Sequence, residues 1–137
     1  MALKQIGIVE LISAIQQRVE DETGLRCYDV VPDNTPSPFY IAEAVSKRPD
    51  NSKTFFRDVF TVWIHCIADG KVSSVDVYDM VQALEEAMTE DITLGEDYWL
   101  QDQTNTGLQN IFDEATGEKH AVCSFELRVC YGFRTKN

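Results

Sequence analysis

Two segments of the chain carry apolar residues at the spacing of an amphipathic helix. The first covers residues 4–23 and stops at Gly24, a residue typical of helix ends. The second runs to Met88, and Ser73 or Ser74 can cap its start. The apolar positions are Ile8, Leu11, Ile12, Ile15 and Val19 in the first segment, and Val77, Met80, Val81, Leu84 and Met88 in the second. This pattern predicts two main helices.

Other segments alternate with the period of a β-strand. Residues 121–133 alternate between apolar and mostly polar positions, so this strand should bury one face and leave the other largely in solvent. Residues 54–68 are apolar on both faces, which is typical of a central strand that is covered on both sides. The pattern also predicts shorter strands over residues 25–31, 39–46, 98–103 and 107–112.

Two connections separate the first three strands. One is a turn-rich connector that contains Pro32, Pro36 and Pro38, and the other is a polar loop of residues 47–53, which we expect to be exposed. The order of elements is therefore helix, three strands, helix, three strands. Two helices are too few to cover both faces of a parallel sheet. We predict an α+β fold, in which a mostly antiparallel sheet has two main helices packed on one face.

The length of the chain bounds its organisation. We expect residues 1–137 to form one domain, with residues 134–137 as a free tail. Residues 1–15 lack the basic start and the small-residue cleavage site of a signal peptide. No apolar run approaches the roughly 18 residues of a membrane span. We therefore expect a soluble, intracellular protein that does not contact a membrane.

The net charge of −11 is concentrated in one part of the chain. Residues 72–118, the acidic block, carry twelve carboxylates and no Lys or Arg, whereas the rest of the chain carries 12 basic and 11 acidic side chains. The block includes the apolar stripe of the second helix, so we expect it to be folded and not an acidic tail. A folded surface of one sign predicts either a basic partner or a surface that repels DNA.

The sequence carries no motif for nucleotide binding, nucleophilic catalysis or metal catalysis. His65 lies inside an apolar strand, as a structural histidine would, and His120 starts the last strand, where it should face solvent. The cysteines at positions 27, 66, 123 and 130 form no CxxC pair, so we expect buried free thiols. Carboxylates near Asp91 and Asp97 can bind a hard divalent cation, but a solvated acidic loop is the simpler interpretation. We expect no catalysis, no cofactor and no bound metal.

Basic residues gather around the polar loop of residues 47–53. Lys47, Arg48, Lys53 and Arg57 lie close to Phe55 in the sequence. At a net charge of −11, a general affinity for phosphate is not expected. We predict instead that this cluster contacts an acidic partner, such as the acidic block of a neighbouring copy.

Three stretches of the chain together have a distinctive order of elements. Residues 28–45 read YDVVPDNTPSPFYIAEAV, which is a short strand, a Pro-rich turn and a strand that opens with an aromatic residue. Residues 59–70 read VFTVWIHCIADG, and residues 73–88 read SSVDVYDMVQALEEAM. These stretches resemble the small tail-completion, or tail-terminator, proteins of long-tailed bacteriophages. The resemblance extends over about residues 3–133. It rests on the order of elements and on the hydrophobic pattern, and not on catalytic residues.

The resemblance implies a structural, head–tail joining protein. Such a protein would form a homo-hexameric ring that caps the finished tail tube and offers the capsid connector a docking surface, with DNA passing through the centre. Its partners would be other copies of itself, the tail tube protein and the neck protein of the connector. It would reside in the neck of the virion, and in the host cytoplasm as a free monomer before assembly.

Two sets of candidate residues follow from this interpretation. The assembly-loop candidates, expected to be mobile in the free subunit and ordered by assembly, are Lys47, Arg48, Asn51, Lys53, Phe55 and Arg57. The candidates for a lumen that repels DNA are Asp76, Asp79, Glu85, Glu86, Glu90, Asp91, Glu96 and Asp97. Two other functions stay open: a small α+β ligand-binding or regulatory domain without catalysis, and a metal-dependent hydrolase that uses the acids near Asp91 and Asp97.

Overall fold

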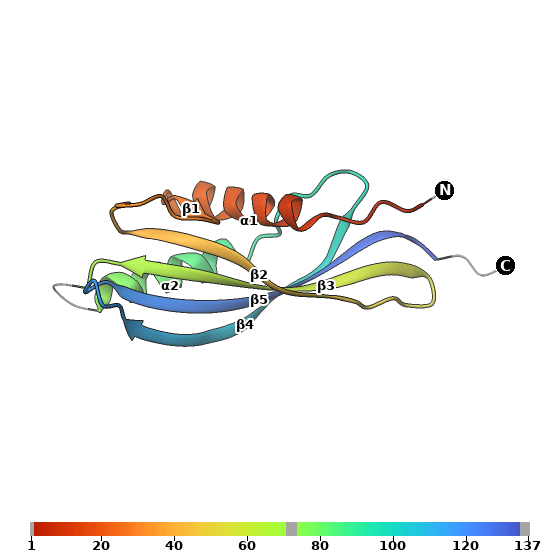
Figure 1. Cartoon of the computed structure of the whole chain (residues 1–137). Helices are drawn as coiled ribbons and strands as arrows, with labels where there is room; N and C mark the ends of the chain where they lie inside the picture. The colour runs from red at the N-terminus through yellow and green to blue at the C-terminus, as the bar shows by residue number, and fades with distance from the viewer. Residues whose placement is uncertain (1, 71–73, 135–137) are drawn as a thin grey trace.

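A long five-stranded sheet forms one layer of the computed structural model, and both helices pack on the same face of it (Figure 1). The structure describes residues 2–70 and 74–134. The elements are α1 (Ile8–Thr23), β1 (Cys27–Tyr28), β2 (Phe39–Pro49), β3 (Phe55–Ala68), α2 (Val75–Ala87), β4 (Trp99–Asp113) and β5 (Lys119–Phe133). The strand order is β1-β2-β3-β5-β4, and among these described strands only β1 and β2 pair in parallel. The predicted α+β class with a mostly antiparallel sheet is confirmed.

The core lies between the two helices and the sheet. Alternate residues of β3 and β5, such as Phe60 and Phe125, join the apolar stripes of α1 and α2 in one buried cluster that includes Leu84. Burial of a side chain of this size stabilises the fold by roughly 1.5–3 kcal/mol. The hydroxyl of Tyr40 on β2 donates to the backbone carbonyl of Met80 on α2 over 2.9 Å, so this buried polar group is satisfied. The two helical stripes and the alternating apolar residues of β5 therefore meet in this core, as the sequence predicts. The prediction that the other face of β5 is largely in solvent is wrong, because Val122 and Ser124 are buried in the middle of the sheet, where β5 pairs with both β3 and β4.

The hairpin of β2 and β3 is longer than the sequence predicts. Lys47 and Arg48 pair in register with Phe60 and Val59, so β2 continues through Pro49 and only residues 50–54 form the turn. Proline is tolerated at this place because the end of an edge strand does not need its N–H for a ladder. The prediction of a loop over residues 47–53 is therefore wrong for its first three residues.

A single strand, β4, replaces the two strands predicted over residues 98–103 and 107–112. Its pairing with β5 is irregular at three places, and these bulges absorb the extra residues. One bulge lies beside Gly107, whose φ of 114° favours glycine. The sequence pattern at this glycine predicts a strand end, whereas the structure uses the glycine to bend a continuous edge strand.

Several element ends also differ from the prediction. Helix α1 begins at Ile8 because Gly7 before it is extended, and Ile6 is buried in the core. The first predicted strand shortens to two residues, Cys27 and Tyr28. Ser74 stands at the N-cap of α2 without a side-chain cap hydrogen bond, and Ser73 lies outside the described residues.

Arg134, the first residue of the predicted free tail, is tethered to the β2–β3 turn. The backbone N–H of Arg134 donates to the carbonyl of Thr54 over 2.6 Å, and residues 135–137 lie outside the described part. Within residues 2–70 and 74–134, no helix has both the length and the hydropathy that crossing a bilayer requires.

Candidate functional site

The predicted assembly-loop residues lie at one end of the sheet, where the β2–β3 turn, the start of β4 and the end of β5 meet (Figure 1). Three aromatic rings gather there. The ring centroids of Phe55 and Phe133 are 5.4 Å apart, those of Phe55 and Trp99 are 5.8 Å apart, and those of Trp99 and Phe133 are 5.7 Å apart. Trp99 is 42% exposed and Phe133 is 66% exposed. We call this cluster of Phe55, Trp99 and Phe133 the aromatic end.

Two arginines beside the aromatic end are neutralised within the subunit. Asp50 in the turn pairs with Arg128 over 2.8 Å and with Arg57 over 3.5 Å. The hydrogen bond from Arg128, together with the charges of the nearby arginines, holds the pKa of the Asp50 carboxyl below its ordinary value. Arg57 is therefore a structural residue of the turn.

Lys47 is likewise paired within the subunit, with the buried carboxyl of Asp58. Asp58 is 2% exposed, and its Oδ2 lies 3.8 Å from Lys47 Nζ without a hydrogen-bond partner among the described residues. Burial raises the pKa of Asp58, and the charge of Lys47 offsets this only in part. Arg48 lies 3.9 Å from Glu126 in an exposed pair that contributes little to stability.

Two further assembly-loop candidates, Asn51 and Lys53, differ in their contacts. The side-chain oxygen of Asn51 accepts from the backbone N–H of Arg57 over 3.0 Å, so Asn51 shapes the turn. Lys53 is exposed and makes no ion pair with the part of the chain that the structure describes. Arg134, whose guanidinium lies 5.9 Å from the ring centroid of Phe56, has no carboxylate partner among the same residues. Lys53 and Arg134 are thus the cations of this region that a partner can still neutralise.

All eight candidates for an acidic lumen are exposed: Asp76, Asp79, Glu85, Glu86, Glu90, Asp91, Glu96 and Asp97. The first four lie on α2, whereas the other four follow it in the connection that leads back along the sheet to the start of β4 (Figure 1). Glu90 pairs with Arg18 of α1 over 3.4 Å, and Glu85 accepts from Asn105 of β4 over 2.8 Å. The acidic candidates therefore extend from the start of α2 along the connection, and two of them have partners within the subunit.

A hollow of about 310 Å³ lies beside the start of α2. Its walls are Pro38 and Met80, and three aspartates, Asp69, Asp76 and Asp79, complete the lining. Val75 and Tyr78, both 55% exposed, lie on the same first turns of the helix. The start of α2 thus combines exposed apolar side chains with carboxylates. The aspartate spacing was visible in the sequence, but the hollow was not.

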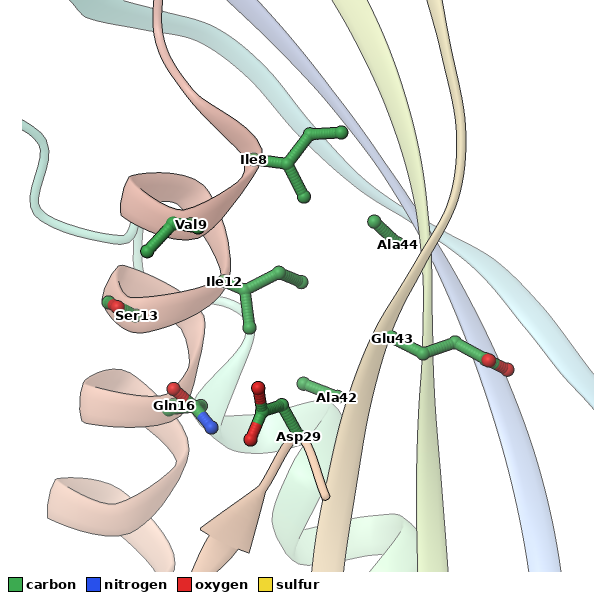
Figure 2. A pocket seen from close by; sticks show the side chains of 9 residues that line it. All are labelled: Ile8, Val9, Ile12, Ser13, Gln16, Asp29, Ala42, Glu43 and Ala44. Carbon is green, nitrogen blue, oxygen red and sulfur yellow. The ribbon is translucent and has the colours of Figure 1, made fainter.

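A second concave surface, of about 270 Å³, separates the first half of α1 from β2 (Figure 2). Ile8, Ile12 and Ala42 supply apolar walls, and Figure 2 shows the carboxylate of Asp29 directed into the groove and that of Glu43 directed away from it. No Lys or Arg is among its lining residues. The groove suits an apolar group and lacks the cation that an anionic metabolite would need.

Both histidines take part in one chain of hydrogen bonds on the sheet. His65 Nε2 lies 2.8 Å from Glu43, His65 Nδ1 lies 2.7 Å from His120 Nε2, and His120 Nδ1 lies 2.6 Å from Glu114. The side chain of His120 is only 13% exposed and stacks on the ring of Phe112 at 4.5 Å. The prediction that His120 faces solvent is therefore wrong, because the β4–β5 turn and Phe112 cover it.

The four cysteines are buried free thiols, as predicted. Burial raises the pKa of Cys27 to about 12, and the hydrogen bond with Cys123, together with burial, raises the pKa of Cys66. The thiols of Cys27 and Cys66 therefore stay protonated and are poor nucleophiles and poor metal ligands. The hydrogen bond with Cys66 lowers the pKa of Cys123. Within the described ranges, no group of three or more His, Cys, Asp or Glu side chains is arranged to hold a metal ion.

The fold is also that of a known virion component. A chain of a solved structure described as "Virion of native gene transfer agent (GTA) particle" superimposes with a TM-score of 0.73 at 18% identity, over 89% of this chain and 96% of that chain. At this identity the similarity shows the fold alone. No curated protein matches the sequence.

The comparison with protein families places the chain among the structural proteins of phage tails. The family model described as "Putative tail termination protein" matches residues 2–137. The chain belongs to this family of phage tail terminators, and the resemblance seen in the sequence is confirmed.

Proposed function

We propose that this protein caps the tail tube as a ring and joins the tail to the capsid connector, with DNA passing through the ring. The observation that carries the proposal is the family match over residues 2–137. Its partners are then other copies of the chain, in a ring of six as the resemblance implies, the tail tube protein and the neck protein of the connector. Before assembly the subunit is a monomer in the host cytoplasm, and after assembly it lies in the neck of the virion.

The surface chemistry supports a structural role and not a catalytic one. His65 and His120 bind each other and two carboxylates, so neither has a free nitrogen directed at a substrate. The cysteine thiols are buried. The exposed groups that remain are charges and aromatic rings, which are the groups that protein interfaces use.

The exposed acids support a lumen that DNA can traverse. The candidates on the α2–β4 connection, Asp91, Glu96 and Asp97, have no basic residue as an ion-pair partner among the described residues. A surface of this kind repels phosphates, so DNA does not lodge on it during passage. We assign this connection, with Glu85, Glu86 and Glu90, to the inner wall of the ring.

Electron microscopy of particles made without this protein tests the proposal. A producing strain that lacks the gene is expected to give tails that are not joined to capsids, and purified protein added to the lysate is expected to restore joining. Joined particles in normal number without the protein would overturn the proposal. A thermal shift with a panel of apolar metabolites, directed at the groove in Figure 2, tests the ligand-binding alternative on the same sample.

A further inference from the structure

We propose that the aromatic end of one subunit docks on the start of α2 of the next copy in the ring. The proposal names the surfaces through which the proposed ring closes, and it therefore rests on the proposed function. Its occupant is a second copy of this chain. The two surfaces lie at opposite ends of the sheet, so one molecule cannot satisfy both by itself (Figure 1).

The aromatic end has the composition of an interface centre. Phe55, Trp99 and Phe133 contact one another, yet Trp99 is still 42% exposed and Phe133 66% exposed. Aromatic rings supply much of the energy of protein interfaces, because they bury a large area with little loss of side-chain freedom. Exposed rings that gather at one place therefore mark a surface that a partner covers.

The start of α2 offers matching apolar groups. Val75 and Tyr78 are each 55% exposed on the first turns of α2, and the hollow walled by Pro38 and Met80 lies at the same end of this helix. A hollow of about 310 Å³ is large enough for one long side chain. The methylene stem of a lysine or arginine can lie against the apolar walls while its charged head reaches the carboxylates.

Charge decides the orientation of the contact. Copies that each carry −11 repel one another, so a stable contact has to place cations of one copy against carboxylates of the next. At the aromatic end, Lys53 and Arg134 have no carboxylate partner among the described residues, whereas Arg57, Arg128 and Lys47 are already paired.

The carboxylates that can receive these cations lie on α2. Asp76 and Asp79 are exposed, line the hollow and have no cation partner in the part of the chain that the structure describes. In the proposed contact, Lys53 and Arg134 of one copy face Asp76 and Asp79 of the next. This assigns Asp76 and Asp79 to the contact between subunits, and leaves the other acidic candidates for the lumen.

The contact is head-to-tail, because it joins two different surfaces of the same chain. Such a contact repeats from copy to copy and gives a ring when the rotation between copies closes. In a closed ring, every aromatic end and every start of α2 is occupied by a contact, so all copies are equivalent.

Site-specific cross-linking tests the proposal in assembled tails. The four native cysteines are buried, so a short bismaleimide will react with introduced surface thiols. Lys53→Cys and Asp79→Cys subunits, mixed and bound to tail tubes, are expected to give cross-linked dimers. Lys53→Cys mixed with Asp97→Cys, the matched control at an acid outside the contact, is expected to give none. Tails that are capped normally but give no dimer from the first mixture would overturn the docking while leaving the proposed function intact.

Charge reversal provides the second test. Lys53→Glu with Arg134→Glu, or Asp76→Lys with Asp79→Lys, is expected to reduce the number of tube-bound subunits at least tenfold in folded protein. The quadruple variant restores opposite charges across the contact and is expected to recover binding. A quadruple variant that binds no better than either double variant, with an unchanged melting temperature, would overturn the proposal. Failure of the wild-type protein to bind tubes would instead overturn the proposed function.

Discussion

His65 Nδ1 and His120 Nε2 face each other at 2.7 Å, and each ring is held from its other nitrogen by a glutamate. Glu43, His65, His120 and Glu114 come from β2, β3, β5 and the β4–β5 turn. This chain of hydrogen bonds therefore links four parts of the sheet.

The first prediction follows from this chain of hydrogen bonds. His120→Gln is expected to destabilise the protein by about 1–3 kcal/mol, since the partners of the imidazole are left unsatisfied. Urea unfolding of the wild-type protein and the variant at pH 7 measures the difference. Equal free energies of unfolding would show that the chain of hydrogen bonds does not stabilise the fold.

The second prediction concerns the buried carboxyl of Asp58. Burial raises its pKa, so the folded chain binds this proton more readily than the unfolded chain. The contribution of Asp58 to stability is therefore present at acidic pH and is lost as the pH rises through the raised value. Asp58→Asn is expected to raise the melting temperature at pH 7 and to have little effect at pH 3.5. Asp33→Asn, at an exposed position, is the matched control and should be neutral at both pH values.

The third prediction concerns the turn between β2 and β3. A mobile loop over residues 47–53 was expected from sequence, but the N–H of Asp50 donates to the carbonyl of Arg57 over 2.9 Å and that of Ser52 to the carbonyl of Phe55 over 3.0 Å. Hydrogen exchange in the free subunit should therefore show both amides protected. Asn51→Ala removes a side-chain acceptor and is expected to cost about 1 kcal/mol and to weaken that protection. Unprotected amides in the wild-type monomer would support the mobile loop instead.

The fourth prediction tests the acidic lumen. Glu86→Lys, Glu96→Lys and Asp97→Lys together should leave the fold intact, because exposed substitutions usually change stability by less than about 0.5 kcal/mol each. Assembled particles that carry this triple variant are expected to eject DNA more slowly, most clearly at low ionic strength, where screening is weakest. Normal ejection times at every salt concentration would remove these residues from the lumen.

Local periodicity explains what the sequence could predict. The stripes of α1 and α2 and the alternation of β5 are properties of neighbouring residues, and the fold class follows from their order. The pairing partners are not local. Nothing near His120 in the sequence shows that Phe112 and Glu114 will cover it, and nothing near Lys47 shows that Asp58 will neutralise it. The prediction of the candidate site was the least accurate. A sequence shows which residues are charged, but it does not show which of these charges are already paired in the fold.

Both open borders of the sheet are irregular. β1 pairs only with Tyr40 and Ile41, so the rest of β2 forms one border, which has a bulge between Ala44 and Ser46 and then Lys47, Arg48 and Pro49. β4 forms the other border and departs from regular pairing at three places. Flat, regular edges act as templates for further strands, whereas bulges, charges and proline prevent that pairing. Growth of the sheet by addition of strands from other molecules is therefore disfavoured at both borders.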